Sequence, residues 1–206
     1  MTSLLAALAK AIFSRASRPR GASLSDNLSY PDACRRAATE PKFFANFRRH
    51  PEYTRILEHV TAQQGQAYLD LIARDAELLA AIETFKLNDR YGNPVTQAYP
   101  ATGDIAPSTL RYVKVLADLK AAFGILNGLD VCEIGVGYGG QCRVINAYYQ
   151  PAAYCLVDIA PALALARRYL ENFAVDTRLA YQTMDELGAA SCDLAISNYA
   201  FTELAR

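Results

Sequence analysis

The residues best suited to chemistry lie in one stretch, where an apolar run with a single acid meets four glycines. Residues 131–140 read Val-Cys-Glu-Ile-Gly-Val-Gly-Tyr-Gly-Gly, and a helical pattern follows from Gln141 to Tyr149. Glycine lacks a Cβ, so this turn can adopt positive φ and let a ligand lie against the backbone. A strand, a glycine turn and a helix in this order are typical of a nucleotide-binding α/β fold, whose ligands bind at the carboxyl ends of the strands.

The glycines fit two ligand classes. Gly135, Gly137 and Gly140 match the G-x-G-x-x-G pattern that binds the pyrophosphate of NAD. Gly135, Gly137 and Gly139 match E-x-G-x-G-x-G, with Glu133 two residues before the first glycine. A carboxylate beside the turn repels a pyrophosphate but attracts a ligand end that carries an ammonium and a sulfonium. The charge of Glu133 therefore favours S-adenosylmethionine over NAD.

Two later apolar runs fall where a nucleoside site needs them. Residues 154–158 end in Asp158, twenty-five residues after Glu133, which is about the length of one βαβ repeat. A carboxylate there can accept hydrogen bonds from both ribose hydroxyls of either cofactor, so Asp158 supports nucleoside binding without choosing between them. Residues 192–197 predict a further strand, and its end would face the group that is transferred.

Five segments, taken in order, resemble the class I S-adenosylmethionine-dependent methyltransferases, most closely the sugar O-methyltransferases of bacteria. They are LNDRYGNP, PSTLRYVKVLADLKAAFG, VCEIGVGYGGQCRVI, CLVDI and DLAISNYAFTEL, and they span roughly residues 85–204. The resemblance implies methyl transfer from S-adenosylmethionine to a hydroxyl of a sugar or glycan. It also implies a set of cofactor-binding residues, namely Glu133, Gly135, Gly137, Tyr138, Gly139, Asp158 and Asn198.

Within that set the resemblance assigns the glycine turn to the methionine end of the cofactor and Asp158 to the ribose. Adenine would lie near residues 182–184, and Asn198 would lie close to the methyl group, together with Tyr199 and Glu203. Transfer to a hydroxyl requires a general base or a metal, because the acceptor proton must be removed. The sequence identifies neither, so the catalytic residues stay unassigned.

The predicted fold is α/β, a Rossmann-like class I methyltransferase core with an incomplete sheet behind an all-helical N-terminal region. Strands are expected at residues 131–134, 154–158, 177–181 and 192–197, whereas the family's sheet has seven. We therefore expect a basic leader at 1–25, a helical accessory region with a connecting loop at 26–107, and the N-terminal half of the methyltransferase domain at 108–206. Such a half would not turn over alone, and its exposed sheet edge would invite pairing with a second copy.

The region before the core combines helical periodicity with basic residues. Residues 29–87 read as helical, and residues 87–107 contain the Gly and Pro of a loop. Ser108 is the expected N-cap of the next helix, on which Arg111 would reach the methionine carboxylate or form a surface ion pair. The basic residues suit either a phosphorylated or nucleotide-linked acceptor or a solvated helix face. They are Arg35, Arg36, Lys42, Arg48, Arg49 and Arg55.

The leader has four basic residues, no acid and apolar residues at helical spacing. Its apolar run is too short to span a bilayer, so no stable membrane insertion is expected. A mitochondrial presequence, an interfacial helix and a plain accessory helix all fit its composition.

Composition narrows the function classes. The 206 residues include 21 basic and 21 acidic ones, which argues against a nucleic-acid binder. Five cysteines occur without metal-ligand spacing, and three of them lie in or beside apolar strands, as buried thiols of a reducing cytoplasm do. No metal site is expected. Two alternatives to a methyltransferase stay open, an NAD-dependent oxidoreductase and a non-catalytic nucleoside-binding module.

Overall fold

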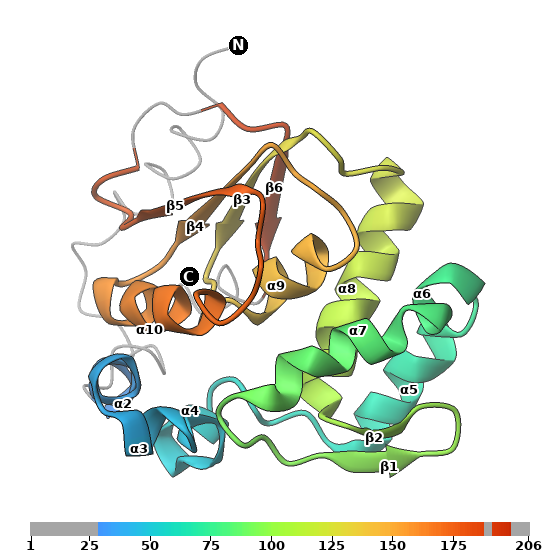
Figure 1. The fold of residues 1–206 in the computed structure, drawn as a ribbon, viewed down its shortest axis with the longest axis horizontal. Helices are drawn as coiled ribbons and strands as arrows, with labels where there is room; N and C mark the ends of the chain where they lie inside the picture. Colours follow the sequence, from blue (N-terminus) through green and yellow to red (C-terminus); the bar gives the residue numbers. More distant parts are fainter. Residues whose placement is uncertain (1–28, 188–190, 199–206) are drawn as a thin grey trace, which may run out of the picture.

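The core of the chain is a parallel sheet with helices packed against it (Figure 1). The structure is a computed structural model that describes residues 29–187 and 191–198. In this part of the chain the sheet has four strands in the order β5-β4-β3-β6. Each strand begins and ends within two residues of its predicted bounds, which confirms the α/β class. The strands are β3 (Asp130–Ile134), β4 (Ala153–Val157), β5 (Arg178–Gln182) and β6 (Leu194–Ser197).

The strand order contains a reversal. The chain builds β3, β4 and β5 outward through the crossover helices α9 (Gly140–Asn146) and α10 (Ala160–Leu170). It then returns to place β6 on the other side of β3. Such a reversal is a topological switch point, and ligands of open α/β sheets bind at the carboxyl ends of the strands that flank it. The fold therefore singles out the ends of β3 and β6.

The two faces of the sheet differ in burial. Val131, Tyr154 and Ile196 belong to a face that is almost completely buried, and α9 and α10 lie beside it in Figure 1. Ala180 and Ala195 alternate with such residues and are exposed. Successive side chains of a strand point to opposite faces, so the described helices leave the second face partly open.

Short helices make up most of the region before the core. Prolines begin two of them, where a missing N–H costs nothing. Thr61 and Gln64 form a capping box at a third, and Asp75 caps a fourth. The elements are α2 (Ser29–Thr39), α3 (Pro41–Phe44), η2 (Phe47–Arg49), α4 (Pro51–Thr54), α5 (Ala62–Ile72), α6 (Ala76–Ala80), α7 (Ile82–Lys86) and η3 (Leu87–Arg90).

A small hairpin corrects the expectation of an all-helical N-terminal region. Its strands β1 (Gln97–Tyr99) and β2 (Gly103–Ile105) pair antiparallel within the predicted connecting loop. The hairpin docks on α5, where the Tyr99 hydroxyl donates a hydrogen bond to the Ala62 carbonyl at 3.1 Å. A Cβ on Gly65 would lie 2.0 Å from that hydroxyl oxygen, so the glycine makes room for the contact. Glycines and prolines predicted the break, but the pairing depends on this tertiary contact.

Helix α8 (Pro107–Phe123) connects the accessory region to the sheet by packing against both α5 and α9. Its N-cap is Ala106, with Pro107 in the first turn, so the prediction of Ser108 as the cap is wrong. The hydroxyl of Ser108 instead bonds to buried charged groups described below. Phe123, the last residue of this helix, is 60% exposed.

Across residues 29–187 and 191–198, no helix combines the length and the apolar character required to cross a membrane. The predicted leader at 1–25 lies outside the described residues.

Candidate functional site

The glycine turn lies at the carboxyl end of β3, at the switch point. Gly135, Gly137 and Gly139 have φ of 82°, 55° and 86°, a region that side chains with a Cβ rarely enter. Gly140 does not share this conformation, but a Cβ there would lie 2.6 Å from the Tyr112 ring and 2.7 Å from the Tyr138 ring. The first three glycines therefore shape the turn, and the fourth allows close packing of α9.

Asp158 is fixed directly beside this turn. Its Oδ2 accepts a hydrogen bond from the Gly137 N–H at 3.0 Å, and its Oδ1 accepts one from the Ile159 N–H at 2.7 Å. Its own N–H donates to the Gln182 carbonyl at 3.4 Å. The structure thus brings together the predicted methionine, ribose and adenine segments. Both oxygens of the Asp158 carboxylate therefore face the backbone at this edge of the sheet, one towards the turn and one towards the residue that follows Asp158.

Glu133 lies beneath the turn rather than facing solvent. It is 2% exposed, and its Oε2 accepts a hydrogen bond from the Tyr154 hydroxyl at 2.7 Å. Burial raises the pKa of the Glu133 carboxyl to about 8, against the opposing effect of the Tyr154 hydrogen bond, and the charge of Asp158 raises it further. The prediction treats this side chain as charged, whereas such a carboxyl is mostly protonated at pH 7.

The side chain of Tyr138 points into the core instead of towards a ligand. Its ring lies 4.8 Å from that of Tyr169 and 5.6 Å from that of Phe47, measured between centroids. The Asn88 side-chain amide donates to its hydroxyl at 3.2 Å. Tyr138 was predicted to bind cofactor, and only its main chain is placed to do so.

The end of β6 faces the start of α9. The Asn198 amide donates to Gln141 Oε1 at 3.4 Å, and the Gln141 amide donates to the Tyr112 carbonyl at 3.2 Å. Next to Asn198, the Ser197 hydroxyl is buried and has no hydrogen-bond partner among residues 29–187 and 191–198. A buried polar atom without a partner costs about 1–3 kcal/mol, and a ligand or water bound at the end of β6 would remove that cost. Tyr199 and Glu203 lie outside the described residues.

Leu57 covers the glycine turn, and sequence reasoning missed it. A Cβ on Gly137 would lie 2.7 Å from Leu57 Cδ1, so the leucine side chain rests on the turn. The Leu57 carbonyl accepts a hydrogen bond from Arg111 Nη2 at 3.4 Å. Arg111 is thereby held, 6% exposed, at the segment that closes over the turn. No pattern around Leu57 marks it, because its role depends on a contact between distant parts of the chain.

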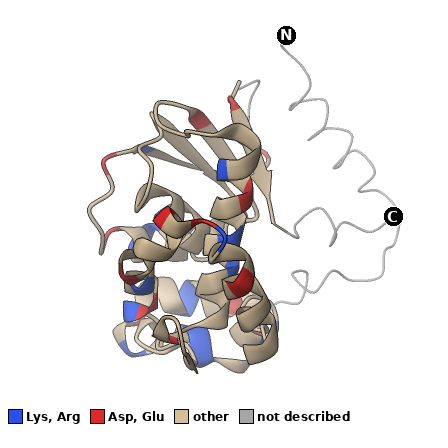
Figure 2. Cartoon of the chain, turned by 90° about the vertical axis from the view of Figure 1, so that its right-hand side faces the viewer, with Lys and Arg blue, Asp and Glu red and all other residues tan. Residues whose placement is uncertain are grey.

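The basic residues of the accessory region are distributed among acidic ones, as Figure 2 shows. Arg36 pairs with Glu40 and Arg35 with Asp32. Arg49 donates to the carbonyls of Asn93 and Pro94. These contacts support the interpretation of a helix face with its own partners over that of a site for a phosphorylated acceptor.

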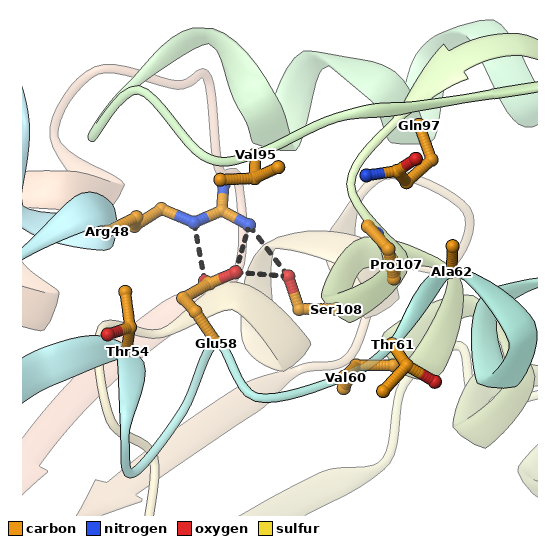
Figure 3. A pocket seen from close by; sticks show the side chains of 10 residues that line it. All are labelled: Arg48, Thr54, Glu58, Val60, Thr61, Ala62, Val95, Gln97, Pro107 and Ser108. Carbon is orange, nitrogen blue, oxygen red and sulfur yellow. Dashed lines mark hydrogen bonds and ion pairs between the residues drawn. The ribbon is translucent and has the colours of Figure 1, made fainter. Parts of the chain in front are cut away.

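Arg48 differs from the basic residues just described, because its side chain is fully buried. It donates to both carboxylate oxygens of Glu58 at 2.6 and 3.4 Å and to Asp89 Oδ1 at 3.1 Å. It also donates to the Asn88 carbonyl and to the Ser108 hydroxyl. The Ser108 hydroxyl in turn donates to Glu58 at 2.6 Å, and Figure 3 shows the contacts among Arg48, Glu58 and Ser108. We call Arg48, Glu58, Asp89, Asn88 and Ser108 the arginine network.

Metal-ligating side chains do not gather in the part of the chain that the structure describes, where no three of His, Cys, Asp and Glu are placed to hold an ion. Cys132 and Cys155 are register partners on adjacent strands. All five cysteines are free thiols, of which Cys34, Cys132 and Cys142 are buried.

Three comparisons with known proteins, against family models, curated sequences and solved structures, find no match.

Proposed function

We propose that this chain binds S-adenosylmethionine at the switch point and belongs to an enzyme that methylates a hydroxyl of a sugar or glycan. The observation that carries the proposal is the left-handed glycine turn at the end of β3, joined to Asp158 at the end of β4 by the Gly137 hydrogen bond. This places a turn that has few side chains of its own, with Leu57 lying over it, next to a carboxylate suited to a ribose.

Different residues of the site would contact different parts of the cofactor. The main chain of residues 135–139 lies along the methionine end, Asp158 accepts from the ribose hydroxyls, and residues 182–184 lie where the adenine would rest. The bound cofactor supplies the methyl group. Ser197 and Asn198, at the end of β6, lie on the side from which an acceptor would approach. Since methyl transfer is an in-line displacement, most of the rate enhancement comes from holding the acceptor oxygen in position.

The buried Glu133 carboxyl makes the proposal testable through the proton that is released or taken up when a ligand binds. A cationic ligand end near the turn favours the ionised form of a neighbouring carboxyl and lowers its pKa. Because burial holds the pKa of Glu133 at about 8, the protein should release the Glu133 proton when a ligand with an ammonium binds at pH 7. A pyrophosphate would have the opposite effect, since its negative charge raises that pKa further.

An NAD-dependent oxidoreductase is the second candidate, and one observation favours it. In the dinucleotide fingerprint the third glycine allows a helix to pack closely on its strand. Gly140 allows a comparably close approach here, because a Cβ at this position would meet the rings of Tyr112 on α8 and Tyr138 in the turn.

Calorimetric titration separates the two candidates. We expect S-adenosylhomocysteine, which keeps the ammonium, to bind more tightly than NAD. Repeating the titration in two buffers of different ionisation enthalpy should show a proton released. Tighter binding of NAD, or proton uptake with S-adenosylhomocysteine, would overturn the proposal.

A further inference from the structure

A cavity of about 280 Å³ opens beside the arginine network, in the accessory region (Figure 3). Ligand pockets usually enclose roughly 300–1,000 Å³, so this one suits a ligand of about a single ring. Its walls come from α4 and the segment after it, from β1 with the residue Val95 before it, and from the first turn of α8. The polar side chains that line it are those of Arg48, Thr54, Glu58, Thr61, Gln97 and Ser108, and the apolar ones are those of Val60, Ala62, Val95 and Pro107.

The one cation in this wall has no donor left for a ligand. A guanidinium has five N–H groups. Those of Arg48 bond to Glu58 through Nε and Nη2, to Asn88 and Asp89 through Nη1, and to Ser108 through Nη2. An anion in the cavity would therefore gain no hydrogen bond from Arg48 without breaking the network.

The network also has more negative than positive charge. Glu58 and Asp89 are two acids that share one guanidinium, and their side chains are only 8% and 11% exposed. Glu58 Oε1 accepts a single bond, from Arg48 Nε, so it keeps acceptor capacity towards the cavity. The Gln97 amide on β1 also lines the cavity (Figure 3). Together these groups favour ligands that donate hydrogen bonds and disfavour phosphates and carboxylates.

The cavity shares its walls with the glycine turn. The Arg48 guanidinium carbon lies 4.9 Å from the centroid of the Tyr138 ring, and Tyr138 belongs to the turn. Glu58 in the cavity wall directly follows Leu57, which covers Gly137. A ligand in this cavity is thus separated from the turn by the side chains of Arg48 and Tyr138.

We propose that this cavity binds a one-ring polyhydroxyl ligand that is neutral or carries an amine, and that it discriminates against phosphorylated and acidic sugars. Because side chains separate the cavity from the glycine turn, this ligand is not the methyl acceptor, and its binding is independent of the proposed function. The inference assigns a ligand class, neutral and amino sugars, to the accessory region.

The test is ligand-observed saturation-transfer NMR on the full chain with glucose, glucosamine, glucose 6-phosphate and glucuronate. We expect signals from glucose and glucosamine that exceed those of the two anionic sugars at least threefold. Val95 lines the cavity and is 52% exposed, so Val95→Trp should fill the space without disturbing the core and should abolish the signals. The matched control, Thr96→Trp, alters the exposed neighbour outside the cavity wall and should keep them.

Equal or stronger signals from the anionic sugars, an absence of signal from all four, or signals that survive Val95→Trp would overturn the inference. Titration of the same proteins with S-adenosylhomocysteine keeps the two proposals apart. We expect its affinity to change less than twofold in Val95→Trp. If wild-type chain binds glucosamine but not S-adenosylhomocysteine, the proposed function fails and the sugar cavity stands.

Discussion

The chain buries polar groups in two neighbouring regions, and the two differ in how completely these groups are paired. In the arginine network every guanidinium N–H has a partner, and both acids accept more than one bond. At the switch point the Ser197 hydroxyl is buried without a partner among the described residues, and three glycines adopt a left-handed conformation. A fully paired buried network stabilises one arrangement, whereas a buried group without a partner can gain one from a ligand.

The largest effect is expected when the arginine network loses its only guanidinium. Arg48→Met leaves Glu58 and Asp89 buried without their cation, and removing one partner of a buried ion pair costs about 3–5 kcal/mol. The free energy of unfolding, measured by urea denaturation, should fall by about that amount. Arg49→Met is the control, because Arg49 is exposed and bonds only to carbonyls, and it should cost less than about 1 kcal/mol. Similar losses in both variants would show that the network does not hold the fold.

The second prediction concerns pH and Glu133. Burial raises the pKa of the Glu133 carboxyl to about 8 in the folded chain. The folded chain therefore keeps this proton up to about pH 8, whereas the unfolded chain loses it above about pH 4.3. The free energy of unfolding should therefore fall as pH rises from about 5 to about 8, by at most about 1.4 kcal/mol per pH unit from this group.

Glu133→Gln removes the titrating proton and keeps the shape of the side chain. Stability measured across that pH range should then be flatter in the variant than in the wild type. Identical pH profiles would mean that the Glu133 carboxyl ionises normally in the folded chain.

The third prediction returns to the switch point. Asp158→Ala removes the acceptor for both ribose hydroxyls, and hydrogen bonds to charged groups contribute about 1.5–3 kcal/mol each. Affinity for S-adenosylhomocysteine, measured by calorimetry, should fall at least tenfold.

Asp193→Ala is the matched control for this loss. Asp193 also accepts a backbone hydrogen bond, from the Asp130 N–H at 2.9 Å, but it lies at the amino end of β3. Its substitution should leave the affinity unchanged. An equal loss in both variants would point to general loosening of the sheet rather than to a ribose contact.

The smallest effect is expected at Ser197, where a substitution distinguishes a ligand contact from a structural one. Ser197→Ala should leave stability in the absence of ligand unchanged or slightly raised, since the hydroxyl has no partner in the described chain. Affinity for S-adenosylhomocysteine should fall by a factor of about 2–10, equivalent to one neutral hydrogen bond of about 0.5–1.5 kcal/mol. A clear loss of stability without ligand would contradict the distinction between the two regions.

Sequence patterns predicted the sheet well because strands and glycine turns are marked by local signals. The four strands and the turn at residues 135–140 follow from apolar runs and from residues that favour positive φ. The contact between Asp158 and the turn follows from parallel strands ending at the same edge.

The remainder depends on contacts between distant residues. Arg48 resembles any other basic residue of a helical segment until Glu58 and Asp89 enclose it. Ser108 has the residue type of an N-cap, but its hydroxyl is recruited by the same network. The protonation of Glu133 depends on how deeply the turn and Tyr154 bury it, which spacing alone does not reveal.

Hydrogen–deuterium exchange with and without S-adenosylhomocysteine tests the central claim most directly, because it locates the ligand. The account predicts slower exchange in peptides covering residues 135–140 and 158–159, no change in the β1–β2 hairpin, and a smaller effect from NAD at the same concentration. Unchanged exchange at the glycine turn, or stronger protection of it by NAD, would contradict the assignment of this site to S-adenosylmethionine.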